Sequence, residues 1–369
     1  MTTTSLTIAD MSSPTGLRFI SLADQEPLTE PERARAIHMA GWVKELLENR
    51  DSRIAQLGLN PATWLPASNW GKGGEAEAFY PAAYRLMRGE NVEWLRIVSQ
   101  CTGFGLWSMC RQPAVPPTDI KVIDQMLSER ASTPDEVALE WCARIRRELP
   151  EYLRIGPPAK FGEVGWLVDD VIVNQDTAVY WERLGLLYRA GMLDRNAKAS
   201  LKAGSRILEI GAGYGALAYY IQRAVPGVRY TVLDIPESLV YSAVYLSALS
   251  SADATDFLPN YEFPRLVHDN EQFALVINTL SMSEMSEQQV RTYCEGIKVL
   301  IGASGVFFEQ NQDNRHVGML NARDIVRDYF SKEELLGGPG LTPDLTQGFA
   351  TIWSNSSGSG DPNRLIPAV

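Results

Sequence analysis

A glycine-rich turn between two apolar segments is the feature of this sequence that most restricts its fold. The run Arg206–Ile210 predicts a buried strand, and Gly211, Gly213 and Gly215 follow it. The next residues, 216–225, predict an apolar helix, and residues 229–233 predict a second strand that closes on Asp234. Glycines at such a turn let a ligand approach the backbone, and the helix N-terminus directs free N–H groups at it. A carboxylate after the second strand can accept hydrogen bonds from both ribose hydroxyls. The segment therefore predicts a nucleotide-type ligand on a β-α-β unit.

The spacing within the turn bears on which nucleotide is bound. Gly211-x-Gly213-x-x-Ala216, with an acid some 20 residues further on, satisfies the relaxed dinucleotide fingerprint. Glu209 and Gly215 extend it to Glu-x-Gly-x-Gly-x-Gly, which resembles the first motif of class I S-adenosylmethionine (SAM) methyltransferases. We therefore expect SAM as the cofactor. A nicotinamide dinucleotide remains an alternative.

Composition narrows the class of partner. The chain has 369 residues, with Lys+Arg 34 against Asp+Glu 45 and a net charge of -11. That charge disfavours nucleic acid and anionic membranes, so we expect a small-molecule substrate. The sequence has no apolar run of about 18 residues, and its N-terminus lacks the pattern of a signal peptide. Scattered cysteines and only three histidines favour a cytoplasmic protein without a metal site.

Alternating strands and helices after residue 202 predict an α/β fold. We expect a doubly wound, mostly parallel seven-stranded sheet of the class I methyltransferase, Rossmann-like type, with an N-terminal helical domain. Besides the glycine unit, strands are expected at 265–267, 273–278, 305–311 and 349–353, and helices at 236–250, 287–300 and 321–330. In such sheets ligands lie at the carboxyl ends of the strands.

The chain divides into five expected segments. Residues 1–28 are predicted to be a flexible N-terminus, 29–160 a helical domain or lid, and 161–201 a connector with a helix that covers the cofactor cleft. Residues 202–355 form the SAM-binding domain, and 356–369 a mobile tail. Within the helical domain, helices are expected at 28–49, 75–89, 91–110, 119–129 and 134–149. These helices could also form the interface of a homodimer.

The strand exits supply the candidate cofactor-binding residues. Asp234 suits the ribose diol and Ile235 can pack on adenine. Asp269 and Asn270, after the expected strand 265–267, could accept from the adenine amino group, although a solvated turn is nearly as good an interpretation. Glu209 could position the glycine loop or contact the amino acid end of the cofactor.

Residues around the reacting centre are less sharply defined. Asn278, at the end of the apolar strand 273–278, could hold the methionine amino group or the substrate, or could be satisfied by backbone groups. Trp166 and Tyr180 are candidates for an aromatic wall, because aromatic faces attract cations such as the sulfonium by about 0.5–2 kcal/mol. A core-packing role for each ring is the simpler alternative.

Methyl transfer to oxygen also needs a base. His316, in a polar loop after the fifth strand, is the favoured candidate, although a solvated surface histidine is at least as good an interpretation. His268, Glu284 and Glu309 are the other candidates.

Several longer segments resemble one family. The segments FGEVGW, VNQDTAVYWERL, LEIGAGYG, LDIPESL, LVINTLSMSEMS and FFEQN, within residues 161–311, resemble a bacterial family of sugar O-methyltransferases of natural-product pathways. That resemblance implies SAM as methyl donor and a small hydroxylated acceptor.

The sequence is also similar to enzymes of nonribosomal-peptide pathways that cyclise SAM to azetidine-2-carboxylate and release methylthioadenosine. In that case SAM is the substrate itself, and Tyr180, Trp166 and Asn278 would shape its methionine moiety. A non-catalytic SAM-binding partner subunit is a further alternative, which the intact glycine motif and Asp234 disfavour.

Overall fold

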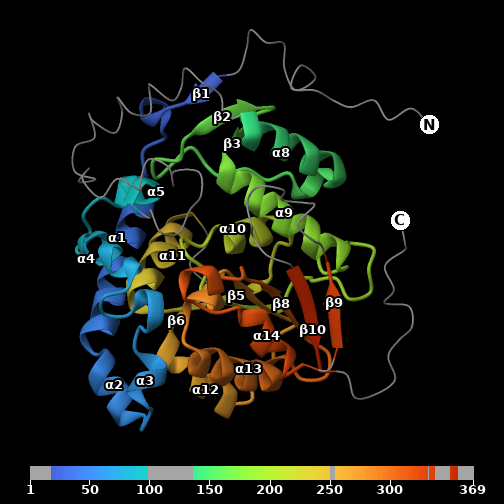
Figure 1. The fold of residues 1–369 in the computed structure, drawn as a ribbon. Coiled ribbons are helices and arrows are strands. Elements are labelled where there is room, and N and C mark those ends of the chain that lie inside the picture. The colour runs from blue at the N-terminus through green and yellow to red at the C-terminus, as the bar shows by residue number, and fades with distance from the viewer. Residues whose placement is uncertain (1–17, 99–135, 250–253, 331, 337–349, 356–369) are drawn as a thin grey trace.

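A computed structural model describes residues 18–98, 136–249, 254–330, 332–336 and 350–355 of the chain. Its centre is a seven-stranded sheet with the strand order β6-β5-β4-β7-β8-β10-β9 (Figure 1). Strands β4 to β8 pair in parallel, and β10 runs antiparallel to both of its neighbours. The predicted doubly wound, mostly parallel sheet is therefore confirmed.

Helices cover both faces of this sheet. One face packs against α9 (Gln175–Arg189), α10 (Ala216–Ala224) and α11 (Pro236–Leu249), and the other against α12 (Phe263–His268), α13 (Glu287–Ile301) and α14 (Ala322–Arg327) (Figure 1). Alternate residues of each strand serve the two cores: Ile277 faces α9 to α11, whereas Val276 faces α12 to α14. Strands buried on both faces read as continuous apolar runs, as the central strands do here.

The glycine-rich segment folds as predicted. Strand β4 (Arg206–Ile210) pairs in parallel with β5 (Arg229–Asp234), and α10 connects them. Strands β7 (Leu275–Thr279) and β8 (Val306–Gln310) continue the sheet on the other side of β4. The chain changes direction between β4 and β7, the point at which a doubly wound sheet binds its ligand.

The third strand lies elsewhere than predicted. Residues 265–267 are part of the helix α12, and the strand that pairs with β5 is β6 (Thr255–Pro259). Pro264 suits the first turn of a helix, and Phe263 and Leu266 are buried on one side of it. A short apolar run such as Leu266-Val267 does not distinguish helix from strand, and here the helical interpretation was the right one.

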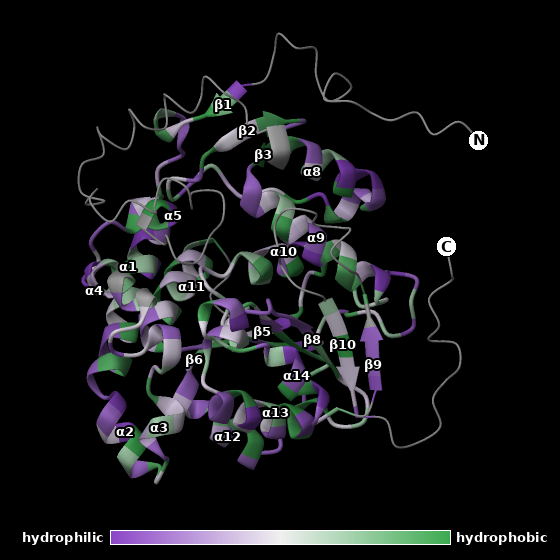
Figure 2. Ribbon diagram, in the orientation of Figure 1, coloured by the Kyte–Doolittle hydropathy of each residue, from purple (hydrophilic) through white to green (hydrophobic). Residues whose placement is uncertain are grey.

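The edge of the sheet is protected by charge. Among the described residues, strand β9 (Lys332–Leu335) pairs with β10 (Ala350–Ser354) alone, and Figure 2 shows it as hydrophilic beside the paler β10. Lys332, Glu333 and Glu334 occupy most of it. Charged residues on an edge strand hinder pairing with another chain.

The N-terminal helices form a layer outside α11. Helix α1 (Glu30–Glu48) starts with a capping box: Thr29 accepts from the Glu32 amide at 3.4 Å, and Glu32 accepts from the Thr29 amide at 2.8 Å. It packs along α11 through Ala36, Ala40 and Val43. Helix α4 (Tyr80–Met87) also packs on α11, and α5 (Leu95–Val98) lies further along the chain. Helices α2 (Arg50–Gln56) and α3 (Pro61–Trp64) extend the layer to the other side of the sheet, where Ile54 and Trp64 are buried with α12 and α13.

A second, three-stranded sheet was not predicted. It has the order β1-β2-β3, with β1 at Arg18–Ile20, β2 at Gly165–Val168 and β3 at Val171–Val173. Residues 18–20 were expected to belong to a flexible N-terminus, but Ile20 is buried against this sheet. Helix α8 (Glu136–Glu148) packs on α9 beside it.

Several predictions fall outside the described residues. They are the N-terminus up to residue 17, the helix at 119–129, most of the helix at 91–110, the start of the helix at 134–149, and the tail from 356. No helix among the described residues is both long and apolar enough to cross a membrane.

Candidate cofactor site

The glycine loop between β4 and α10 requires its glycines. Gly211, Gly213 and Gly215 have φ angles of 75°, 58° and 88°, which disfavour a side chain. A Cβ at Gly211 would lie 2.2 Å from the Ser281 hydroxyl oxygen, and one at Gly215 would lie 2.9 Å from a methyl group of Leu246. Gly211 and Gly213 remain partly exposed. A ligand can therefore reach the backbone of this loop.

Asp234 ends β5 beside the loop. Its carboxylate accepts from the Ile235 amide and from the Ser238 hydroxyl, each at 2.9 Å. Burial raises the pKa of Asp234 to about 7, although these hydrogen bonds and one from the Gly213 amide act in the opposite direction. A carboxylate offers about four acceptor positions, so it keeps capacity for ligand hydroxyls. Ile235 follows it and is also partly exposed.

Glu209 lies on the face of the sheet that α9 covers. It is buried and accepts from the Tyr230 hydroxyl at 2.7 Å. Burial raises the pKa of Glu209 to about 7, against the lowering effects of Tyr230 and of the Arg183 charge. Glu209 is therefore a buried acid close to the loop, and the charge of Arg183 acts to lower its pKa.

Asn278 is fully buried at the carboxyl end of β7, and its side chain is fully bonded. It donates to the Ile210 carbonyl at 2.8 Å and to the Ser281 hydroxyl at 2.6 Å. It accepts from the Asn311 amide group at 2.9 Å and from the Met282 backbone at 3.3 Å. These four bonds connect the carboxyl ends of β4, β7 and β8. Two of them are to backbone groups, the alternative role that the sequence left open for Asn278.

Asp269 and Asn270 do not follow a strand. They lie just after α12 and are exposed, and Asp269 pairs with Arg265 at 3.7 Å and with His268 at 3.1 Å. The strand exit predicted for them is occupied by Asn260, which comes directly after β6 and is buried. Asn260 donates to the Trp64 carbonyl at 2.8 Å. The strand TDFLP before it gave a weak sequence signal, because only part of it is apolar.

Trp166 and Tyr180 contact different aromatic rings. Trp166 lies on β2 and packs edge-on against Phe19, with ring centroids 5.0 Å apart. Tyr180, on α9, stacks on Tyr220 at 5.6 Å and meets Tyr214 of the glycine loop edge-on at 6.0 Å. The structure thus brings Tyr180, but not Trp166, into contact with the loop.

A buried charge cluster behind the loop had no counterpart in the sequence analysis. Arg96 of α5 is fully buried and forms ion pairs with Glu163 and Asp176. Its guanidinium carbon lies 3.8 Å from the centroid of the Tyr214 ring. Asn174 donates to Glu163 at 2.6 Å and caps α9. Arg96 lies 67 residues before Glu163 and 80 before Asp176 in the sequence, which is why no local pattern indicated the cluster.

The candidate bases lie in three different environments. His316 is exposed in a 3-10 turn, with Nδ1 3.1 Å from the Asp313 carbonyl oxygen, and His268 is also exposed. Glu284 accepts from the Trp70 indole at 2.7 Å, and burial raises its pKa. Glu309 is fully buried, accepts from Asn311 at 2.8 Å, and has its pKa raised to about 7 by burial. Among the described residues no group of three or more His, Cys, Asp or Glu side chains is placed to hold a metal ion.

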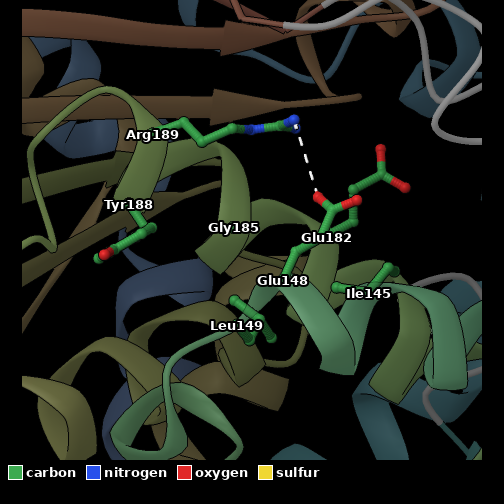
Figure 3. A pocket seen from close by; sticks show the side chains of 7 residues that line it. All are labelled: Ile145, Glu148, Leu149, Glu182, Gly185, Tyr188 and Arg189. Atoms are coloured by element: carbon green, nitrogen blue, oxygen red, sulfur yellow. Dashed lines mark ion pairs between the residues drawn. The ribbon is translucent and has the colours of Figure 1, made fainter. Parts of the chain in front are cut away.

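A small pocket opens between α8 and α9, away from the glycine loop. Figure 3 shows its lining, with Arg189 directed toward Glu148 at 3.9 Å. Glu182 is buried beside it, and burial raises the pKa of Glu182 to about 7. The other lining residues are Ile145, Leu149, Gly185 and Tyr188.

Comparisons with known proteins add only a likeness of fold. No protein-family model matches the sequence, and no curated protein matches it. Among solved structures, a candidate SAM-dependent methyltransferase from Methanococcus maripaludis is 14% identical with a TM-score of 0.35, over 49% of this chain and 89% of that one. A TehB-like SAM-dependent methyltransferase from Corynebacterium glutamicum is 16% identical with a TM-score of 0.33, over 48% and 97%. Human methyltransferase-like protein 13, in complex with SAH, is 14% identical with a TM-score of 0.35, over 47% and 78%.

The strand order itself defines the fold. A mostly parallel sheet in the order 3-2-1-4-5-7-6, with its last strand antiparallel, is the class I methyltransferase fold that the sequence predicted. Because a fold hosts many functions, the activity has to be argued from the site.

Proposed function

We propose that this chain binds SAM and is a SAM-dependent transferase. The observation that supports this best is the unit formed by β4, the glycine loop and β5, with the partly exposed Asp234 at its end. In this proposal Asp234 accepts the ribose hydroxyls and Ile235 packs on the adenine. The glycine loop and the N-terminus of α10 lie against the amino acid end. Asn260, in place of Asp269 and Asn270, stands where the adenine amino group would be recognised.

The reaction we favour is O-methylation of a small, sugar-like acceptor in natural-product metabolism, as the family resemblance implies. When bound, SAM supplies an electrophilic methyl group. The residues of the chain would orient the acceptor oxygen in line with it and receive the hydroxyl proton. Among the candidate bases, Glu309 has a pKa suited to proton transfer near neutral pH, whereas His316 has access to solvent.

A second candidate function is the cyclisation of SAM itself. Its support is the ring cluster that meets the glycine loop, in which Tyr180 contacts both Tyr214 and Tyr220. Such faces favour a sulfonium and a water-poor setting, which an intramolecular attack of the amine on the γ-carbon requires. The ammonium of SAM would first lose a proton to water, and the neutral amine would then form the C–N bond while the C–S bond breaks, its electrons passing to sulfur with release of methylthioadenosine.

One experiment separates these reactions. Purified protein is incubated with SAM, without and then with a panel of sugar acceptors, and products are followed by mass spectrometry. S-adenosylhomocysteine that forms only with an acceptor supports methyl transfer and contradicts cyclisation. Methylthioadenosine with azetidine-2-carboxylate, formed without any acceptor, supports cyclisation. If no adenosyl compound binds or reacts, the SAM proposal itself is wrong.

A further inference from the structure

Arg183 is a buried cation for which the described residues provide no ion pair. Its side chain lies on α9 and the residue is only 3% exposed. Nε donates to the Gln310 amide oxygen at 3.1 Å, whereas Nη2 is buried and has no hydrogen-bond partner. No carboxylate of the described residues lies within 4.0 Å of the guanidinium. A buried charge in this state is costly, and arginine is favoured where a carboxylate can accept two parallel N–H bonds.

The position of Arg183 connects it to the candidate cofactor site. It is one turn beyond Tyr180, whose ring centroid lies 5.3 Å from the guanidinium carbon and which contacts the glycine loop through Tyr214. Gln310, its hydrogen-bond partner, is the last residue of β8. Arg183 therefore lies at the carboxyl edge of the sheet, across β7 from the glycine loop. In parallel sheets of this type the ligand occupies that edge.

Two acids that interact with the charge of Arg183, Glu209 and Glu182, do not form an ion pair with it. The charge of Arg183 acts to lower the pKa of Glu209 and of Glu182, its neighbour on α9. Burial raises the pKa of both acids to about 7. When both acids are protonated, neither supplies a charge that compensates the guanidinium.

We propose that Arg183 anchors a carboxylate of the bound ligand at the carboxyl ends of β4 and β8. The inference rests on the proposed SAM function and adds a chemical requirement to it: the molecule opposite the glycine loop is a carboxylic acid. Two sources share this chemistry. One is the amino acid end of SAM itself, and the other is an acceptor that carries a carboxylate.

The test uses the full-length protein and calorimetric titration with three adenosyl compounds. SAM has the carboxylate, decarboxylated SAM lacks it, and methylthioadenosine lacks the whole amino acid end. The variants are Arg183→Met, which keeps the apolar packing, and Arg183→Lys, which keeps the charge without the planar fork. Arg195→Met is the matched control, because Arg195 also stacks on a tyrosine, with its guanidinium carbon 3.8 Å from the Tyr152 ring centroid, but lies away from the loop.

If the carboxylate belongs to SAM, the unmodified protein binds SAM at least tenfold more tightly than decarboxylated SAM. Arg183→Met then removes this preference and Arg183→Lys retains part of it. Methylthioadenosine affinity stays unchanged in all variants, which also shows that the nucleoside site is folded.

If the carboxylate belongs to an acceptor, SAM and decarboxylated SAM bind equally well. Acetate then binds the protein saturated with methylthioadenosine, and Arg183→Met abolishes that binding. The proposal is overturned if neither the SAM preference nor acetate binding depends on Arg183. Failure of methylthioadenosine to bind at all would instead contradict the proposed SAM function.

Discussion

At the scale of single residues, those with a fixed spacing from the glycine turn were predictable and those brought in from elsewhere were not. Glu209, the glycines and Asp234 lie on one β-α-β unit, so local sequence fixes their relative positions. Arg96 and Arg183 reach the same region from α5 and α9, and only tertiary packing places them there. Asn278 was found in sequence, but its role depends on partners such as Asn311 that no spacing indicates.

The raised pKa of Asp234 makes ligand affinity depend on pH. Its pKa in the folded protein is about 7, well above the usual value for an aspartate. Ribose hydroxyls donate to the ionised carboxylate, so SAM affinity should be constant above about pH 7 and fall below it, by at most about tenfold per pH unit. Calorimetric titration with SAM between pH 5 and 8 measures this.

The linked effect on stability has the opposite sign. Between about pH 4 and 7 the folded protein retains a proton that the unfolded chain has lost, so Asp234 lowers the stability of the ligand-free protein as pH rises through this window. Urea titrations of the ligand-free protein at these pH values measure it. Binding of SAM to the ionised Asp234 carboxylate offsets this loss of stability.

Replacement of Asp234 tests the ribose assignment directly. Asp234→Asn removes the charge-assisted bonds, so SAM binding should weaken at least tenfold, about 1.4 kcal/mol, and its pH dependence near 7 should flatten. Asp269→Asn is the control, since Asp269 is exposed and lies beyond α12. A weaker SAM affinity in Asp269→Asn, with none in Asp234→Asn, would contradict the site as we describe it.

At the scale of elements, the hairpin and the third strand show where sequence patterns were insufficient. The segment WLVDDVIV forms β2 and β3 around Asp169 and Asp170, which have φ angles of 45° and 64°. Two residues with positive φ between apolar runs form the turn that suits a tight hairpin, so this signal was available in the sequence. The helix α12 carried no comparable signal, because its apolar run is too short to show a period.

The cluster around Arg96 joins α5, α9 and the segment before β2, so its loss should be costly. Arg96→Met leaves Glu163 and Asp176 buried without their cation, and we expect the free energy of unfolding to fall by about 3 kcal/mol or more. Urea titration followed by circular dichroism measures this change. Arg88→Met removes the exposed pair with Glu90 and should leave the midpoint unchanged. Equal stability of both variants would show that the cluster contributes little.

At the scale of the whole molecule, the N-terminal layer and the sheet are held together at both ends of α11. Arg35 of α1 donates to the Ser247 and Ala248 carbonyls at 2.8 and 2.9 Å, near the C-terminal end of α11. Arg50 of α2 pairs with Glu237 in the first turn of α11 at 2.7 Å. Between these contacts α1 buries its small apolar residues on α11. We therefore expect a layer bound in this way to unfold together with the sheet rather than to move as a lid.

This arrangement predicts one cooperative unfolding transition for the layer and the sheet. Tryptophans lie in both parts, among them Trp64 in the N-terminal layer and Trp353 on β10, so tryptophan fluorescence and far-UV circular dichroism should give coincident urea curves. SAM at about 100 times its Kd should raise the free energy of unfolding by about 2.7 kcal/mol. Both curves should show this gain, because unfolding of either part would destroy the site. A layer that acted as a separate lid would instead separate the two curves, and only the sheet would gain stability from the ligand. Coincident curves would mean that α1, distant from the glycine loop in sequence, folds in one cooperative unit with the loop.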